Sequence, residues 1–163
     1  MKLVLVIVII VCFLFLGYGL SKYYIERKRF FSEFELFLSN LNSSISFGRE
    51  KLLDIIEKNN QYKSETLSKL CDNYATALKN KMPVDDKIFD GISTLKNDEK
   101  QLFISFFSML GKYDVYSQNK EINSYSVKFS ELYQYANEDC KKYASLIIKL
   151  TVIAGLLVCL LII

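Results

Sequence analysis

The chain of 163 residues contains no histidine. Without an imidazole it cannot form the usual serine triad, a cysteine–histidine pair or a histidine metal site. Its six glycines are too dispersed to build a phosphate-binding loop, and no lysine follows a glycine-rich turn as in a P-loop. These absences exclude the usual signatures of hydrolases, histidine metalloproteins and nucleotide-binding proteins.

Proline is nearly absent too, with one residue, and the alternating apolar and polar runs that a sheet needs are few. An all-α fold is therefore predicted. The four cysteines are too few and too scattered for a disulfide framework. Cys12 and Cys159 lie in apolar ends of the chain, and Cys71 and Cys140 fall on apolar faces of predicted helices, so all four are interpreted as buried, reduced thiols.

Excess charge is also lacking, because the net charge is only +3. No nucleic-acid footprint is visible. The two carboxylate pairs, Asp85 with Asp86 and Asp98 with Glu99, stand at predicted helix starts, where the helix dipole favours negative charge. We therefore predict no catalytic, cofactor-binding or metal-ligating residue and no small-molecule substrate.

The chain is strongly apolar at both ends. Leu3 to Leu20 reads LVLVIVIIVCFLFLGYGL without a charge, and as a helix it spans about 27 Å of the roughly 30 Å hydrocarbon layer. Leu146 to Ile163 carries one charge, Lys149, whose ammonium can reach the headgroups. We predict transmembrane helices over 1–20 and 146–163, and a helical bundle of about six helices over 21–145.

A cleaved signal peptide is the alternative for the first segment, because Lys2 makes a basic start and Gly17 and Gly19 resemble a cleavage site. The apolar run is longer than a usual signal core and is followed at once by basic residues, which favours a retained anchor. Cys12 does not fit a lipoprotein site, since Val11 precedes it.

The orientation follows from the cations, because short positively charged flanks stay in the cytoplasm. The outer flanks offer only Lys2 and the α-amino group. The inner flanks carry Lys22, Arg27, Lys28, Arg29, Lys141, Lys142 and Lys149. Tyrosines suited to an interfacial belt fall near the inner boundaries at Tyr18, Tyr23, Tyr24 and Tyr143. The middle of the chain is thus predicted to face the cytoplasm, with both termini outside.

Apolar residues at spacings of three and four define the helices of the bundle. The first helix is expected to continue out of the membrane to Gly48, a residue suited to a left-handed cap. The others are expected from Arg49 to Lys58, from near Ser64 to before Pro83, from Asp85 to about Leu95, from the N-cap Asn97 to Gly111, and from about Ser117 through the second span.

Twelve phenylalanines at helical spacing indicate a core. The adjacent Phe30 and Phe31 point in different directions, so one of them is expected to face lipid or a partner. Gly155 beside Ala154 could allow close helix packing, but no residue as small as these two stands four positions from Gly155 to complete a strong motif, so this signal is weak. The connectors 59–64 and 80–87 are candidate partner surfaces.

Two stretches and the terminal spans carry a family resemblance. They are LGKYDVYSQNKEI, from Leu110 to Ile122, and ISFGREKL around Gly48. In their order and spacing the chain resembles stage III sporulation protein AB. The resemblance implies a protein of endospore formation that is similar to half of the inner-membrane platform protein of type II secretion and type IV pilus systems.

That resemblance also implies partners and a location. They are the other proteins of the complex that links mother cell and forespore, including a secretion-type ATPase, and the domain would face the mother-cell cytoplasm. The family carries no catalytic residues to transfer. On physical grounds Gly111 ends a helix, while Asp114 and Gln118 fix the start of the long helix, with Asp114 or Ser117 as its cap.

These observations favour a non-enzymatic membrane scaffold whose cytoplasmic bundle docks a motor or channel component and transmits its state to two membrane helices. One alternative is a pore-forming protein, although the spans offer almost no polar residue beyond Thr151. Another is an outward-facing binding domain whose first segment is cleaved and whose last segment is a tail anchor.

Overall fold

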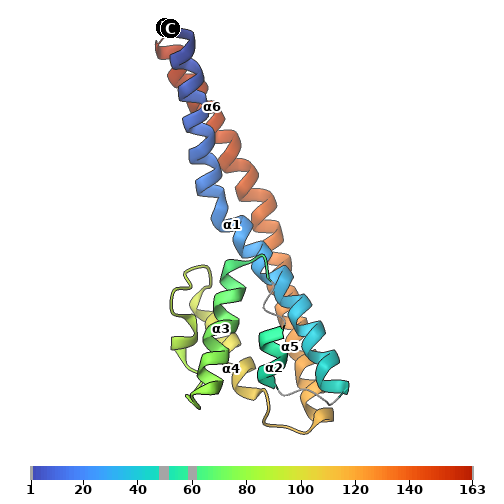
Figure 1. Cartoon of the computed structure of the whole chain (residues 1–163). Coiled ribbons are helices and arrows are strands. Elements are labelled where there is room, and N and C mark those ends of the chain that lie inside the picture. Colours follow the sequence, from blue (N-terminus) through green and yellow to red (C-terminus); the bar gives the residue numbers. More distant parts are fainter. Residues whose placement is uncertain (1, 48–51, 59–61, 163) are drawn as a thin grey trace. The chain divides into compact units, whose positions relative to one another are not determined.

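A computed structural model describes residues 2–47, 52–58 and 62–162. No strand occurs in these ranges, so the predicted all-α fold is confirmed. In chain order the elements are α1 (Lys2–Phe47), α2 (Leu52–Lys58), α3 (Glu65–Lys79), the 3-10 turn η1 (Asp86–Phe89), α4 (Asn97–Met109), α5 (Val115–Asp139), the π-helical segment η2 (Cys140–Ala144) and α6 (Ser145–Ile162) (Figure 1).

The chain divides into two compact units. Residues 1–28 and 134–163 form the terminal unit, and residues 29–133 form the central unit. Helices α1 and α5 each contribute residues to both units. We describe each unit by itself.

In the terminal unit, α1 and α6 run antiparallel and side by side (Figure 1). Gly17 faces Thr151, and a Cβ atom added to Gly155 would lie 3.1 Å from the Cβ atom of Phe13. Ser21 is also fully buried. The small residues thus allow the two helix backbones to approach closely, because no larger side chain separates them.

Much of the remaining surface of this helix pair is apolar and exposed, with Phe15 exposed to 75% and Leu160 to 74%. The helical stretches Val8–Ser46 and Val115–Leu160 each contain a window of high mean hydropathy, 1.8 and 2.2. Among the described residues, two helices are therefore long and apolar enough to cross a membrane.

The core of the central unit is a cluster of phenylalanine rings centred on Phe34 of α1. The ring centroid of Phe34 lies 4.8 Å from that of Phe103 on α4 and 4.7 Å from that of Phe129 on α5. Most phenylalanines were predicted to be core, and those of the cluster are fully buried. Its other members are Phe30, Phe37, Phe106 and Phe107.

Phe30 and Phe31 are both buried, so the expectation that one of them faces lipid or a partner is wrong. Their rings contact each other, with centroids 5.0 Å apart. The ring centroid of Phe103 lies 5.5 Å from that of Phe30 and 6.4 Å from that of Phe31, so one α4 ring packs against both. These adjacent residues of α1 are buried together because their rings contact each other and the same α4 ring.

Buried polar contacts join α3 to its neighbours within the central unit. The Ser64 hydroxyl accepts a hydrogen bond from the Leu67 N–H at 3.3 Å, while the Ser64 N–H donates to Glu33 of α1 at 2.9 Å. The Tyr74 hydroxyl donates to the backbone carbonyl of Phe107, in the last turn of α4, at 3.1 Å. Burial raises the pKa of Tyr74, so its phenol remains a donor at neutral pH.

The helix predicted from Asp85 to about Leu95 is wrong. Only the four residues of η1 are helical there, and Gly91 then takes a left-handed backbone conformation with φ +76°. The apolar residues of the segment are nevertheless buried, at Ile88, Phe89, Ile92 and Leu95. The spacing of these apolar residues therefore reflects burial in an irregular segment. Hydrogen bonds from α3 to the backbone of this segment take the place of those within a continuous helix.

Two helix limits also differ from the prediction. Lys96, and not Asn97, is the N-cap residue of α4, and its N–H donates to the Glu99 carboxylate at 2.9 Å. The last helix begins at Val115 and contains the π-helical segment η2. Cys140, the first residue of η2, is only half-buried and Cys12 of α1 is exposed, so the interpretation of all four thiols as buried is wrong.

The Cys71 thiol is expected to be unreactive in the folded protein. It is buried in α3, and burial, with a smaller contribution from Asp72, raises its pKa to about 12. At pH 8 only about one thiol in 10⁴ is then ionised. Maleimide labelling in mild detergent, mapped by mass spectrometry, should modify Cys140 but reach Cys71 only after denaturation. Rapid labelling of Cys71 without denaturant would contradict its placement.

Candidate functional site

The carboxylates considered as possible catalytic groups bind backbone at helix ends. The Asp85 carboxylate accepts from the N–H of Lys87 at 3.0 Å, at the start of η1. Glu99 accepts from the N–H of Lys96, as described above. Within the described ranges no three metal-ligating side chains come together. The geometry therefore favours a capping role for these carboxylates.

A groove of about 530 Å³ lies between the C-terminal half of α3, the following loop and η1. We call it the α3–η1 groove. Its lining includes four of the eight residues of the connector 80–87, which the sequence offered as a candidate partner surface. Its lining residues are Asn73, Thr76, Ala77, Met82, Pro83, Asp85, Lys87, Ile88 and Asp90.

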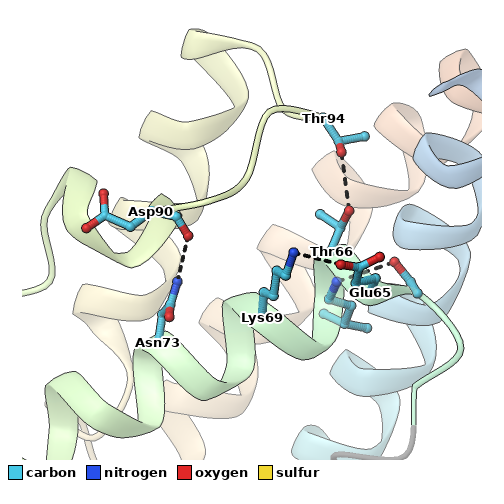
Figure 2. Close-up of polar contacts among 8 residues, drawn as sticks. Glu65, Thr66, Lys69, Asn73, Asp90 and Thr94 are labelled. Atoms are coloured by element: carbon cyan, nitrogen blue, oxygen red, sulfur yellow. Dashed lines mark hydrogen bonds and ion pairs between the residues drawn. The ribbon is translucent and has the colours of Figure 1, made fainter.

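The groove is held in shape by polar contacts from α3. The Asn73 amide donates to the backbone carbonyl of Ile88 at 3.0 Å and to that of Asp90 at 3.2 Å, and Figure 2 shows the second of these contacts. Nearer the start of α3, the hydroxyls of Thr66 and Thr94 lie 3.2 Å apart (Figure 2). The irregular segment that replaces the predicted helix is therefore tied to α3 through its backbone and at one side chain.

The groove combines apolar and charged side chains. Ala77 and Ile88 are buried on its apolar side, whereas Met82 is 57% exposed. The loop turns at Lys81, which has a positive φ of 53°. Asp85 and Lys87 supply charge of both signs. The described lining contains no histidine or thiol to act as a nucleophile.

The predicted turn between α4 and α5 has three residues of interest. Gly111 has a φ of +78°, the left-handed conformation that favours glycine. The Asp114 carboxylate accepts from the N–H groups of Tyr116 at 3.1 Å and Ser117 at 3.3 Å, so Asp114 rather than Ser117 caps α5. The N–H of Gln118, whose side chain is buried, donates to the Asp114 carbonyl at 2.9 Å.

Asp114→Ala is expected to lower the melting temperature of the protein, because it exposes the first N–H groups of α5. Hydrogen bonds from the Ser117 side chain and backbone hold the pKa of Asp114 below its ordinary value. Its stabilising effect is therefore complete above the ordinary aspartate pKa and disappears as the pH falls through the lowered pKa. Thermal unfolding in detergent between neutral and acid pH measures this.

Glu121→Ala is the matched control, since it removes a carboxylate from an exposed position inside the same helix. The destabilisation by Asp114→Ala should shrink at acid pH, while Glu121→Ala should show no comparable loss. Equal behaviour of the two variants at every pH would contradict the capping role.

Four of the remaining predicted residues are span limits, and the fifth is the cap Gly48. Leu3 and Leu20 lie within α1, and Leu20 is exposed. Leu146 is exposed in α6. The predicted cap Gly48 and the span limit Ile163 lie outside the described residues.

The contact between Gly17 and Thr151 was not predicted from the sequence. Thr151 and Cys159 stand four positions before and after Gly155, and Cys159 is buried while Thr151 faces Gly17. A weak signal was there, since small residues at intervals of four mark a helix contact. The Thr151 hydroxyl donates to the carbonyls of Ile147 at 3.0 Å and Ile148 at 2.9 Å, so this polar group is satisfied within its own helix.

The described ranges thus define an all-helical protein in which, along the chain, apolar helical segments long enough for a membrane precede and follow a unit with an aromatic core. Comparison with protein families adds the particular assignment. The chain matches the family described as stage III sporulation protein AB over residues 2–163, and it belongs to that family. It is therefore a protein of the sporulation stage. No curated protein and no solved structure matches the chain.

Proposed function

We propose that this protein is a non-enzymatic scaffold of the endospore-forming, secretion-like complex that links mother cell and forespore. In this proposal residues 1–20 and 146–163 cross the mother-cell membrane, and residues 21–145 face the cytoplasm. There the helical domain docks a secretion-type ATPase. The observation that carries the proposal is the pair of membrane-length helices that flank, in the sequence, a unit whose described carboxylate caps and buried rings serve folding.

The distribution of charge supports the orientation. Lys22 and Lys28 follow the first apolar segment, and Lys141 and Lys142 precede the second. Lysine and arginine near a span are retained in the cytoplasm. The membership of the family supports a role in sporulation.

The α3–η1 groove is the proposed docking surface for the ATPase. It offers the exposed Met82 beside Pro83, and methionine adapts to partners of varied shape. The Asn73 bonds to the η1 backbone pre-organise the surface, which reduces the entropy lost on binding. A partner helix that inserts one apolar side chain would bury Met82.

Binding of the purified ATPase to the full chain in nanodiscs tests this proposal. Met82→Glu should weaken binding at least tenfold, because it places an unpaired charge in the contact. Val127→Glu is the matched control, since Val127 is an exposed apolar residue of α5, at 61%. Its binding should equal that of the wild type.

Two results would contradict the proposal. If the wild-type chain in nanodiscs does not bind the ATPase, docking is wrong. If Met82→Glu and Val127→Glu bind as well as the wild type, the groove is not the docking surface. Melting curves of both variants confirm that any loss is not due to unfolding.

A further inference from the structure

The π-helical segment η2 lies just before the second membrane-length apolar segment. It consists of CKKYA, with Lys141, Lys142 and Tyr143 in sequence. A π turn places one extra residue in a helix, and such turns occur frequently at functional sites. Tyr143 precedes Leu146 by three residues, or about 4.5 Å along a helix. If α6 crosses the bilayer from Leu146, η2 lies at the depth of the lipid headgroups.

This segment packs against α1 in the terminal unit. The rings of Tyr143 and Tyr24 stack with centroids 5.4 Å apart and planes at 28°. Tyr24 also meets Tyr23 edge to face at 5.4 Å. Because α1 and α6 are antiparallel, the next turn of α1, with Arg27 and Lys28, lies level with the first residues of η2. Two basic segments far apart in the sequence thus meet beside one aromatic stack.

The charge at this level is positive on balance. The lysines of η2 are exposed, and the Nζ atom of Lys142 lies 5.2 Å from the ring centroid of Tyr143. The cations are Lys22, Arg27, Lys28, Lys141 and Lys142, and the carboxylates are Glu26, Glu138 and Asp139, so five charges against three leave +2. An anionic group is therefore favoured over a zwitterionic one.

We propose that η2 and the adjoining turn of α1 bind the phosphate headgroup of an anionic phospholipid. Lys141 and Lys142 supply the ammonium groups for the phosphate, while Tyr143 and Tyr24 place the amphipathic rings that belong at the headgroup level. Basic pockets between membrane helices on the cytoplasmic side recognise such lipids. This inference rests on the proposed crossing of the membrane, and it adds a lipid to the partners of the protein.

The test uses the full chain in nanodiscs made from mixtures of phosphatidylglycerol and phosphatidylcholine. Native mass spectrometry after transfer to detergent measures which lipid stays bound. The wild type should retain phosphatidylglycerol preferentially, and the double variant Lys141→Gln, Lys142→Gln should reduce this preference by up to about 30-fold. Lys141→Arg with Lys142→Arg should preserve it, since both charges remain.

The matched control is Lys112→Gln with Lys120→Gln, which removes two exposed lysines from the central unit. It should leave the preference intact. Equal retention of both lipids by the wild type, or a Lys141→Gln, Lys142→Gln variant that retains phosphatidylglycerol like the wild type, would overturn the proposal. Displacement of the bound lipid by soluble glycerol phosphate would overturn a membrane lipid as the ligand.

The outcome is separable from that of the proposed function. ATPase binding in nanodiscs of phosphatidylcholine alone tests docking without an anionic lipid. If that binding fails while lipid preference persists, the docking proposal is wrong and the lipid site stands. If binding persists while lipid preference is absent, only the lipid site is wrong.

Discussion

Phe34→Ala is expected to lower the free energy of unfolding of the central unit by about 3–5 kcal/mol, because it removes a fully buried ring. The Phe34 ring contacts rings of α4 and α5 at 4.8 Å and 4.7 Å, so the substitution leaves a cavity where three helices meet. The nearby rings are held by other contacts and cannot collapse fully into the space.

The Cys71 thiol supplies the measurement, since it is buried in the same unit and reacts only when that unit opens. Labelling of Cys71 in mild detergent should become faster by at least about a hundredfold in Phe34→Ala. Leu36→Ala is the control, because Leu36 lies on the same helix and is 62% exposed. Its labelling should change by less than about threefold. Similar rates in Phe34→Ala and Leu36→Ala would contradict the aromatic core.

Gly17→Leu should separate the two helices of the terminal unit. A Cβ atom at Gly17 already collides with the Thr151 side chain, and a leucine adds three further carbons. Overpacking of this kind costs about 1–3 kcal/mol. Gly19→Leu is the matched control, because a Cβ atom added there meets nothing within 4 Å.

A disulfide between Phe13→Cys and Gly155→Cys can report the separation, in a background without native cysteines. The Cβ atoms of these positions would lie about 3.1 Å apart, close to the range that a disulfide requires. Oxidation in membranes should crosslink the pair efficiently with Gly17 or with Gly19→Leu, and poorly with Gly17→Leu. Undiminished crosslinking in Gly17→Leu would show that the helices do not approach through this glycine.

Periodicity predicted the all-α fold and the aromatic core because both depend on local spacing. An apolar residue at every third or fourth position, as at Phe30, Phe34 and Phe37, buries one face of a helix wherever its partner lies. The membrane-length helices were equally predictable, since length and hydropathy are properties of a single segment.

The segment 85–95 could not be predicted by the same rule. The apolar spacing of this segment resembles that of a helix. However, the Asn73 side chain of α3 donates hydrogen bonds to two backbone carbonyls of the segment, and Gly91 turns the chain. Those contacts come from another element and leave no pattern in the segment itself. The burial of both Phe30 and Phe31 was missed for a similar reason, because it depends on where α4 packs.

The candidate docking surface was only partly predictable. Connector 80–87 was one of two connectors between predicted helices offered as a partner surface, but the groove also requires the wall of α3 with Asn73 and Ala77. The π turn of η2 has no recognisable sequence signal, since the spacing continues through it as in an ordinary helix. Thr151 and Cys159 carry a weaker signal of helix contact than glycine or alanine, because their side chains are larger.

The location of the central unit is the point on which the proposed scaffold depends most. Single cysteines at Tyr116, which is 81% exposed in the central unit, and at Lys2 can be labelled with a membrane-impermeant maleimide in growing cells that express the chain. If the central unit faces the cytoplasm, we expect Lys2→Cys to be labelled in intact cells and Tyr116→Cys only after lysis. Labelling of Tyr116→Cys in intact cells would place the central unit outside and contradict the proposed scaffold.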